Sequence, residues 1–203
     1  MTSMPETRRR IAVCPGSFDP VTYGHLDIIS RASRLFDRVI VLVSTNIDKR
    51  PSFTLTERLL MIEKVTAQYQ NVVVDILEAE LLADYVRRVG ADVIVKGLRA
   101  VTDFEYEFQM ALGNRKLCPE AETVFLTTSA ENMYLSSSIV KQIAVFGGDI
   151  SSFVPAEILP VIESRLRRLP APSEVDPETR ARLVQQVQQF AKTIGKDENH
   201  ECI

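Results

Sequence analysis

The chain has 203 residues, of which 45% are hydrophobic and 25% are charged. This length is enough to bury one sizeable hydrophobic core, so one main domain is the default expectation. The net charge of −3 argues against broad binding of nucleic acid, which needs a concentrated basic surface. No stretch approaches the roughly 18 consecutive apolar residues that a membrane helix requires. We therefore expect a cytoplasmic protein with no membrane span and no nucleic-acid partner.

The three cysteines, Cys14, Cys118 and Cys202, are far apart and none belongs to a C-x-x-C pair. This spacing indicates neither a zinc site nor a disulfide framework. Residues 1–10 run directly into a strand-like segment and lack the apolar core of a secretory signal. We expect free thiols in a reducing compartment.

Apolar runs typical of strands alternate with amphipathic segments typical of helices along most of the chain. That alternation predicts an α/β fold, a doubly wound parallel sheet of five strands covered by helices. The expected strands are Arg10–Cys14, Arg38–Ser44, Val72–Leu77, Asp92–Val95 and Thr123–Thr128.

The segments between these strands have the periodicity and the end signals of helices. Thr54 and Glu57 have the spacing of a capping box, Gly90 ends an apolar stripe, and Asp103 can cap a long helix. The expected helices are Gly24–Phe36, the Thr54 cap to about Gln68, Leu81–Val89, Asp103–Leu117, a helix that starts at Ser136–Ser138, and Pro155–Arg168.

A proline-rich linker follows the last of these helices. We expect a main domain over residues 1–169 and an appendage over residues 170–203, made of the linker, an extra C-terminal amphipathic helix and a polar tail. Asp176 followed by Pro177 is typical of a helix start. The apolar residues of this tail helix recur at helical intervals and are Leu183, Val184, Val187, Phe190, Ala191 and Ile194. They predict that the helix docks one face on the protein surface.

The stretch Pro15–Asp27 connects the first strand to the first helix, which is where α/β folds bind phosphates. Its small residues allow close approach of the backbone, Ser17 supplies a hydroxyl group, and His25 stands where the helix begins. Such a turn can hold an anion and place a proton-bearing group beside it.

Two further loops carry groups that suit phosphates. Lys96–Ala100 follows the fourth strand, and Ser136–Ser138 begin a helix with free backbone N–H groups. Because the carboxyl ends of parallel strands meet at one edge of a sheet, we expect these loops to converge on one crevice. Cations, a histidine and helix N-termini suit a substrate with several phosphates. The joint set is Ser17, His25, Lys49, Lys96, Arg99 and Ser136–Ser138.

The residues favour direct displacement over other chemistry. Ser17 has no base beyond His25, and no Cys-His or Ser-His-Asp set stands out, so covalent catalysis is weakly supported. The sequence has neither the G-x-x-x-x-G-K-[ST] phosphate loop nor the G-x-G-x-x-G dinucleotide motif. What remains is displacement between two bound phosphate compounds, driven by positioning and charge stabilisation.

Gly16–Pro20 followed by Thr22–His25 resembles the signature of the nucleotidyltransferase superfamily, in which a [ST]-x-G-H element binds ATP phosphates. Further motifs resemble the bacterial phosphopantetheine adenylyltransferase family over about residues 10–169. These motifs are Gly97–Glu107, Met110-Ala111, Asn114-Arg115, Leu135–Ser138 and Gly147–Asp149. The resemblance implies a Rossmann-like nucleotidyltransferase fold.

It also implies an enzyme of coenzyme A biosynthesis that joins ATP to 4′-phosphopantetheine, giving dephospho-coenzyme A and pyrophosphate. The family is homohexameric and uses Mg²⁺, which the ATP phosphates carry, so no metal ligand is expected from the protein. Ser17 would hold phosphate of both substrates, and His25 would stabilise the transition state at the α-phosphate. A protonated or a neutral imidazole can donate a hydrogen bond to the charge that develops there.

The remaining binding residues follow from the same resemblance. Lys49, Leu82 and Lys96 would contact phosphopantetheine. Lys96 and Asn132 stand where the family commonly has an arginine and an aromatic residue. The residues that would bind ATP are Ser17, Phe18, His25, Gly97, Leu98, Arg99, Glu107, Asn132, Met133, Tyr134, Leu135, Ser136, Ser137 and Ser138.

Plainer interpretations stay open for some of these residues. Leu82 lies on an apolar stripe and can simply pack in the core. Lys49 can be part of a solvated charge pair, Glu107 can pair with Arg115, and Ser136–Ser138 can simply cap a helix. Two alternative functions also stay open: a sister nucleotidyltransferase that uses nicotinate mononucleotide or a cytidylyl substrate, and a non-catalytic regulator that binds a nucleotide or coenzyme A.

Overall fold

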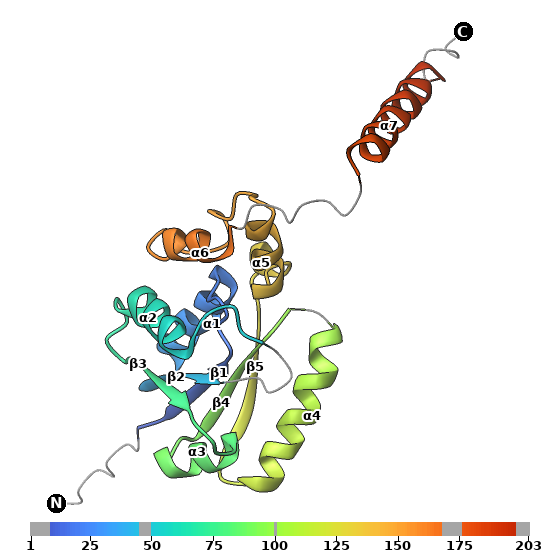
Figure 1. Ribbon diagram of the computed structural model, residues 1–203. Coiled ribbons are helices and arrows are strands. Elements are labelled where there is room, and N and C mark those ends of the chain that lie inside the picture. The colour runs from blue at the N-terminus through green and yellow to red at the C-terminus, as the bar shows by residue number, and fades with distance from the viewer. Residues whose placement is uncertain (1–8, 45–49, 100, 168–175, 198–203) are drawn as a thin grey trace, which may run out of the picture. The chain divides into compact units, whose positions relative to one another are not determined.

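The computed structural model describes residues 9–44, 50–99, 101–167 and 176–197. The chain divides into two units, Met1–Arg168 and Leu169–Ile203. Within the described part of the first unit, five parallel strands form one sheet in the order β3-β2-β1-β4-β5 (Figure 1). The strands are β1 (Ile11–Gly16), β2 (Arg38–Ser44), β3 (Val72–Leu77), β4 (Val93–Leu98) and β5 (Glu122–Thr127).

Strand β4 is longer than the sequence pattern predicts. The expectation that Lys96–Leu98 form a loop is wrong, because these residues continue the ladder with β5. Lys96 pairs with Phe125 and Gly97 pairs with Leu126. The apolar run ends at Val95, but backbone pairing with the neighbouring strand does not depend on apolar side chains. The charged Lys96 therefore lies on the sheet, and Arg99 comes directly after the strand.

Helices follow every strand of the first unit. They are α1 (Tyr23–Leu35), α2 (Leu55–Thr66), α3 (Leu82–Val89), α4 (Val101–Leu117), α5 (Ser137–Val145) and α6 (Leu159–Leu166), with a short 3₁₀ turn η1 (Ala130–Asn132). The capping box at Thr54 is confirmed, because the amide of Glu57 donates to the Thr54 hydroxyl at 3.2 Å. Gly90 ends α3 with a φ of 65°, a left-handed conformation that glycine adopts without strain.

Two helix starts differ from the prediction. Helix α4 begins at Val101, so Asp103 lies inside the helix and does not cap it. Helix α6 begins at Leu159, not at Pro155. The carbonyl of Pro155 accepts hydrogen bonds from the amides of Ile158 and Leu159, which makes a separate turn before the helix.

Helices cover both faces of the sheet, as the doubly wound prediction requires. On one face, Val41 and Val43 of β2 belong to a core cluster shared with α1, α2, α5 and α6. On the other, Leu42 packs with Tyr85 and Val86 of α3, and Phe125 of β5 meets Phe104 of α4 at a ring distance of 6.1 Å. Neighbouring residues of one strand thus face opposite layers, and the predicted fold class is confirmed.

The strand order reverses between β1 and β4 (Figure 1). Strands β2 and β3 lie in succession on one side of β1, and β4 and β5 lie in succession on the other. At such a switch point the loops after the two strands diverge and leave a crevice at the carboxyl edge. The two loops begin after Gly16 and after Leu98. Both segments were predicted to bind phosphate.

The second unit contains helix α7 (Pro177–Asp197). The amide of Thr179 donates to the Asp176 carboxylate at 2.8 Å, so the predicted start at Asp176 is confirmed. Leu183, Val184 and Val187 expose about half or more of their side chains. Among the helices that the structure describes, α7 included, none is long and apolar enough to cross a membrane.

Candidate active site

The turn between β1 and α1 presents Ser17 to solvent and buries the next side chain. Phe18 has a φ of 47° and is buried in the core. Its ring leaves no room for a side chain at Gly16, where an added Cβ would lie 2.9 Å from it. The turn is therefore built on a close approach that glycine allows. Any contact of Phe18 with ATP is limited to its backbone.

His25 is fixed by the start of the helix that contains it. Its Nδ1 atom accepts a hydrogen bond from the backbone N–H of Thr22 at 3.0 Å. An amide N–H can only donate, so the proton of a neutral imidazole lies on Nε2. The spacing Thr22-x-x-His25 is that of a capping box with histidine in place of glutamate. The sequence contained this signal, although the pattern is less common.

The surroundings of His25 keep it neutral at pH 7. Burial and the nearby positive charge of Arg99 lower the pKa of His25 to about 4. The His25 and Phe18 rings also meet in a T-shaped contact, with 5.1 Å between centroids. Of the two protonation states considered from the sequence, the lowered pKa favours the neutral one, with Nε2–H as a hydrogen-bond donor.

The end of β4 contributes two cations and one glycine. A Cβ at Gly97 would lie 2.9 Å from Cγ1 of Ile28, so Gly97 lets α1 pack closely against this strand. Lys96 forms an ion pair with Glu107 of α4 at 3.1 Å. Arg99 donates to the carbonyl of Leu135 at 2.9 Å and so links β4 to the segment before α5.

The segment between β5 and α5 is held next to α1. The amide of Ser129 donates to the Asp27 carboxylate at 3.1 Å, and Asn132 donates from its amide group to the Ser129 hydroxyl at 2.8 Å. Met133 and Tyr134 are exposed, whereas Leu135 is buried. Two apolar side chains therefore project from a fixed segment beside the start of α1.

The three serines differ in their surroundings. Ser136 caps α5, since its hydroxyl accepts from the amide of Ile139 at 3.1 Å. Ser137 donates to the carbonyl of Pro20 at 2.8 Å, and Ser138 is exposed. The bond from Ser137 brings the N-terminus of α5 to the turn that precedes α1. The predicted convergence of the first, fourth and fifth strand ends is thereby confirmed.

The residues expected on the phosphopantetheine side are not gathered in the same way. Lys49 lies outside the described residues. Leu82 is half-buried and packs against the cluster that contains Tyr85 and Val86, which supports its plainer interpretation as a core residue. Glu107 pairs with Lys96 rather than with Arg115, the partner that the plainer interpretation offered, and Arg115 lies 3.9 Å from Glu122.

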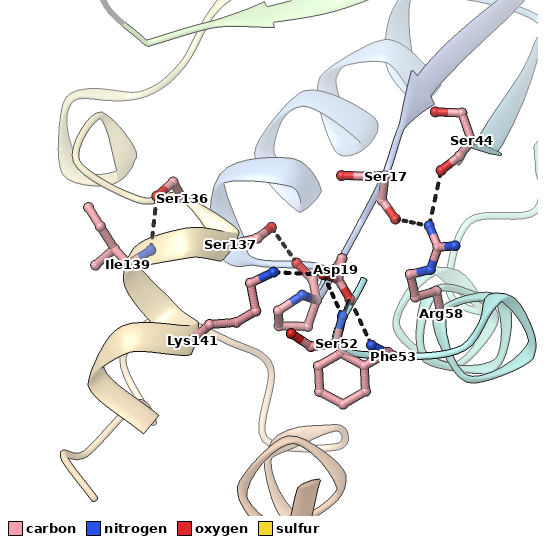
Figure 2. A network of polar contacts seen from close by, with 11 residues as sticks. Ser17, Asp19, Ser44, Ser52, Phe53, Arg58, Ser136, Ser137, Ile139 and Lys141 are labelled. Atoms are coloured by element: carbon pink, nitrogen blue, oxygen red, sulfur yellow. Dashed lines mark hydrogen bonds and ion pairs between the residues drawn. The ribbon is translucent and has the colours of Figure 1, made fainter. Parts of the chain in front are cut away.

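Three charged residues near the turn were missed by the sequence analysis. Asp19 is buried and lies 2.7 Å from the ammonium group of Lys141 (Figure 2). Arg58 is 2% exposed and donates from one nitrogen to the carbonyls of Ser17, at 2.7 Å, and Ser44, at 3.0 Å. The available signal for Arg58 was its position on the apolar face of α2. Asp19 and Lys141 gave no comparable signal because their pairing spans 122 residues.

The main unit matches known proteins. Residues 13–143 match the model of the cytidylyltransferase-like family, which is more than half of the chain. The chain is 56% identical over 156 residues to the phosphopantetheine adenylyltransferase of Alkaliphilus metalliredigens, a match that spans 77% of this chain and 99% of the relative. The chain belongs to the phosphopantetheine adenylyltransferase family. A Clostridium perfringens member is 56% identical over 160 residues, or 79% of this chain and 97% of the relative.

A solved structure supports the fold assignment independently of close sequence similarity. A protein from Vibrio parahaemolyticus, assigned as a nicotinate-nucleotide adenylyltransferase, has a TM-score of 0.59 and 17% sequence identity to this chain. The superposition covers 78% of this chain and 98% of the other. At this identity the similarity shows the nucleotidyltransferase fold alone. The choice of phosphopantetheine adenylyltransferases over other members comes from the relatives at 56% identity.

Proposed function

We propose that this protein transfers the adenylyl group of ATP to 4′-phosphopantetheine and releases dephospho-coenzyme A and pyrophosphate. Family membership supports the reaction. The observation that carries it is the joint placement of a neutral His25 and the N-terminus of α5 at one turn, through the bond from Ser137 to Pro20. Helix N-termini favour anions, so this turn suits a polyphosphate.

A single displacement accounts for the chemistry. A phosphate oxygen of the acceptor attacks the α-phosphorus of ATP, and a new P–O bond forms while the bond to the leaving pyrophosphate breaks. Negative charge is spread over the equatorial oxygens during this step. Nε2–H of His25 donates a hydrogen bond to one of them, and Arg99 adds positive charge nearby. No covalent enzyme intermediate is needed.

We assign the substrates to the two sides of the turn. On the acceptor side, Ser17, Lys49, Leu82 and Lys96 bind phosphopantetheine, with Ser17 shared between both substrates. Leu82 packs in the core and offers only its remaining exposed surface, and Lys96 contributes charge that Glu107 partly balances. The ATP side consists of Ser17, the Phe18 backbone, His25, Gly97, Leu98, Arg99, Glu107, Asn132, Met133, Tyr134, Leu135, Ser136, Ser137 and Ser138.

We propose that Mg²⁺ takes part as an ion that the nucleotide brings. Among the residues that the structure describes, no group of three or more His, Cys, Asp or Glu side chains is placed to hold a metal ion. Hard cations of this kind are commonly bound through substrate phosphates with few protein ligands. Bound to ATP, Mg²⁺ would neutralise part of the triphosphate charge.

We also propose that the protein acts as a cytoplasmic homohexamer. Helix α4 supports association between copies, because it exposes several large apolar side chains, and an exposed apolar patch often marks a surface that binds another protein. These residues are Phe104, Tyr106, Phe108, Met110, Leu112 and Leu117. Light scattering should give a mass near six times the 22.8 kDa of one chain. A monomer at micromolar concentration would contradict the proposal.

The assay that tests the function offers alternative acceptors in separate reactions. The purified protein is incubated with ATP, Mg²⁺ and either 4′-phosphopantetheine or nicotinate mononucleotide, and with CTP in place of ATP as a further arm. We expect pyrophosphate release with ATP and phosphopantetheine alone. Release only with nicotinate mononucleotide, or only with CTP, would favour the sister nucleotidyltransferase. Nucleotide binding without any release would favour the non-catalytic regulator.

Replacement of His25 tests the proposed transition-state contact. His25→Ala should lower kcat by about 10²–10³, the usual loss when a donor to a developing oxyanion is removed, with a much smaller change in the affinity for ATP. His25→Asn is the matched control for folding, because its short side-chain oxygen can still accept from Thr22 while the Nε2 donor is lost. Both variants should be slow and folded. Nearly intact turnover in either one would contradict the role of His25.

A further inference from the structure

The carboxylate of Asp19 is the centre of a network that joins three elements at the phosphate-binding turn. It accepts hydrogen bonds from the backbone amides of Ser52 and Phe53, at 3.0 Å and 2.9 Å, just before α2 begins. It also pairs with Nζ of Lys141 in α5 at 2.7 Å (Figure 2). The Asp19 side chain is 8% exposed and that of Lys141 is 26% exposed. Asp19 therefore ties the turn to the start of α2 and to the body of α5.

Helix α5 contacts the turn at two successive levels. Ser137, at its first position, donates to the carbonyl of Pro20, and Lys141 pairs with Asp19 one helical turn later. Residues four apart lie on the same face of a helix, so both contacts come from one side of α5. Besides the packing of α5 in the core cluster, these two polar contacts, separated along its axis, define the direction of the helix relative to the turn.

The direction of α5 decides where its first backbone N–H groups lie. The first turn of a helix has N–H groups without partners inside the helix, and the macrodipole adds partial positive charge there. Ser136 satisfies only one of these groups, the amide of Ile139. A change in the direction of α5 would therefore move donors that face the turn containing Ser17 and His25.

We infer that Asp19 and Lys141 are positioning residues for adenylyl transfer, which fix the N-terminus of α5 relative to the turn before α1. The inference rests on the proposed function. We place Lys141 outside the phosphate ligands, because its ammonium group lies 2.7 Å from the Asp19 carboxylate, which the amides of Ser52 and Phe53 hold in place. Asp19 is a positioning residue because its buried carboxylate is held by the amides of Ser52 and Phe53 and by Lys141.

The first test replaces Lys141, which is partly exposed and leaves Asp19 with two backbone donors. We expect Lys141→Met to keep its fold and to lower kcat about tenfold to a hundredfold, because small misplacements of binding groups have effects of this size. The KM for phosphopantetheine should change less than about twofold, because the substitution removes no group that binds this substrate in the ground state. Lys141→Arg is the matched control and should restore at least half of kcat. A stable Lys141→Met variant with wild-type kcat would overturn the inference.

The second test separates positioning from direct phosphate binding. If Lys141 were a phosphate ligand held back by its partner, Asp19→Asn would free the ammonium group and tighten ATP binding. We expect the opposite, a lower kcat and weaker ATP binding. The double variant should be about as impaired as the worse single variant, because both changes break one contact. Tighter ATP binding in Asp19→Asn, or losses that simply add in the double variant, would contradict the positioning role.

These readouts also distinguish the inference from the proposed function. The wild-type protein is first assayed with ATP and phosphopantetheine, and absence of turnover there would reject the proposed function alone. The dissociation constant for ATP, measured by calorimetry on each variant, tests the network without any turnover. Unchanged ATP affinity in both single variants, together with unchanged kcat, would reject the positioning role while the proposed function stands.

Discussion

Asp19 lies on the turn before α1 and His25 in the first turn of that helix, yet their surroundings favour a neutral His25 and a charged Asp19. Burial and the charge of Arg99 lower the pKa of His25. Burial raises the pKa of Asp19, but Lys141 and the amides of Ser52 and Phe53 more than offset it, so the net pKa is lowered. The turn thus presents a neutral donor to a ligand and keeps its negative charge inside the protein.

The lowered pKa of His25 predicts a specific pH dependence of stability. As pH falls below 6.5, the unfolded chain gains a proton on this histidine that the folded protein does not accept until about pH 4. The free energy of unfolding should therefore decrease across this window, by at most about 3 kcal/mol. Urea unfolding of wild type and His25→Asn at pH 7, 6 and 5 measures this. An identical pH dependence in both proteins would contradict the prediction.

At the scale of elements, the close packing of α1 on β4 sets the distance between the turn after β1 and the end of β4, the two segments at the switch point. Gly97 allows this packing, because a Cβ there would meet the branched side chain of Ile28 at 2.9 Å. The sequence analysis placed Gly97 in a loop that could bind phosphate. The structure gives another reason for a glycine at this position, which is the close contact between β4 and α1. The same residue can still offer its backbone to a ligand at the sheet edge.

Gly97→Ala tests this packing at the level of stability. Overfilling a packed contact should lower the free energy of unfolding by about 1–3 kcal/mol. Gly113→Ala is the matched control, because an added Cβ in this exposed part of α4 meets nothing within 4 Å. It should raise stability by about 0.5–1 kcal/mol, the usual gain of alanine over glycine inside a helix. Equal effects of the two substitutions in urea unfolding would argue against the proposed contact.

At the scale of the whole molecule, the main unit and the tail have different relations to the family. The match to the A. metalliredigens relative spans 99% of that protein but only 77% of this chain. The matched part of this chain therefore corresponds to nearly the full length of that relative. Leu183, Val184 and Val187 of α7 nevertheless expose apolar surface that favours burial.

Truncation after Leu169 tests the role of the tail. We expect adenylyl transfer to persist, because the predicted site lies in the main unit. We also expect a lower Tm or a smaller oligomer, since the prediction that the tail helix docks on the protein surface implies lost apolar burial. Thermal unfolding and light scattering on both proteins measure these effects. Unchanged Tm together with unchanged mass would show that the tail does not dock.

Much of the site could be predicted because its signals are local. Ser17 and His25 lie on one turn, Ser136 caps the helix that follows it, and Arg99 comes directly after a strand. The rule that parallel strands end at one edge then brings these segments together. The contacts of Asp19 and Lys141 could not be predicted in this way, because they join residues on distant elements.

The sequence by itself determined the doubly wound sheet, the bounds of β2 and β3, and the turn that contains His25. Apolar periodicity and end signals act over a few residues, so they can be read along the chain. Only the tertiary structure decided that β4 continues through Lys96, that His25 is neutral, and that Asp19 pairs with Lys141. These properties depend on a neighbouring strand, on burial and on a charge from another helix, and all three arise only when the chain has folded.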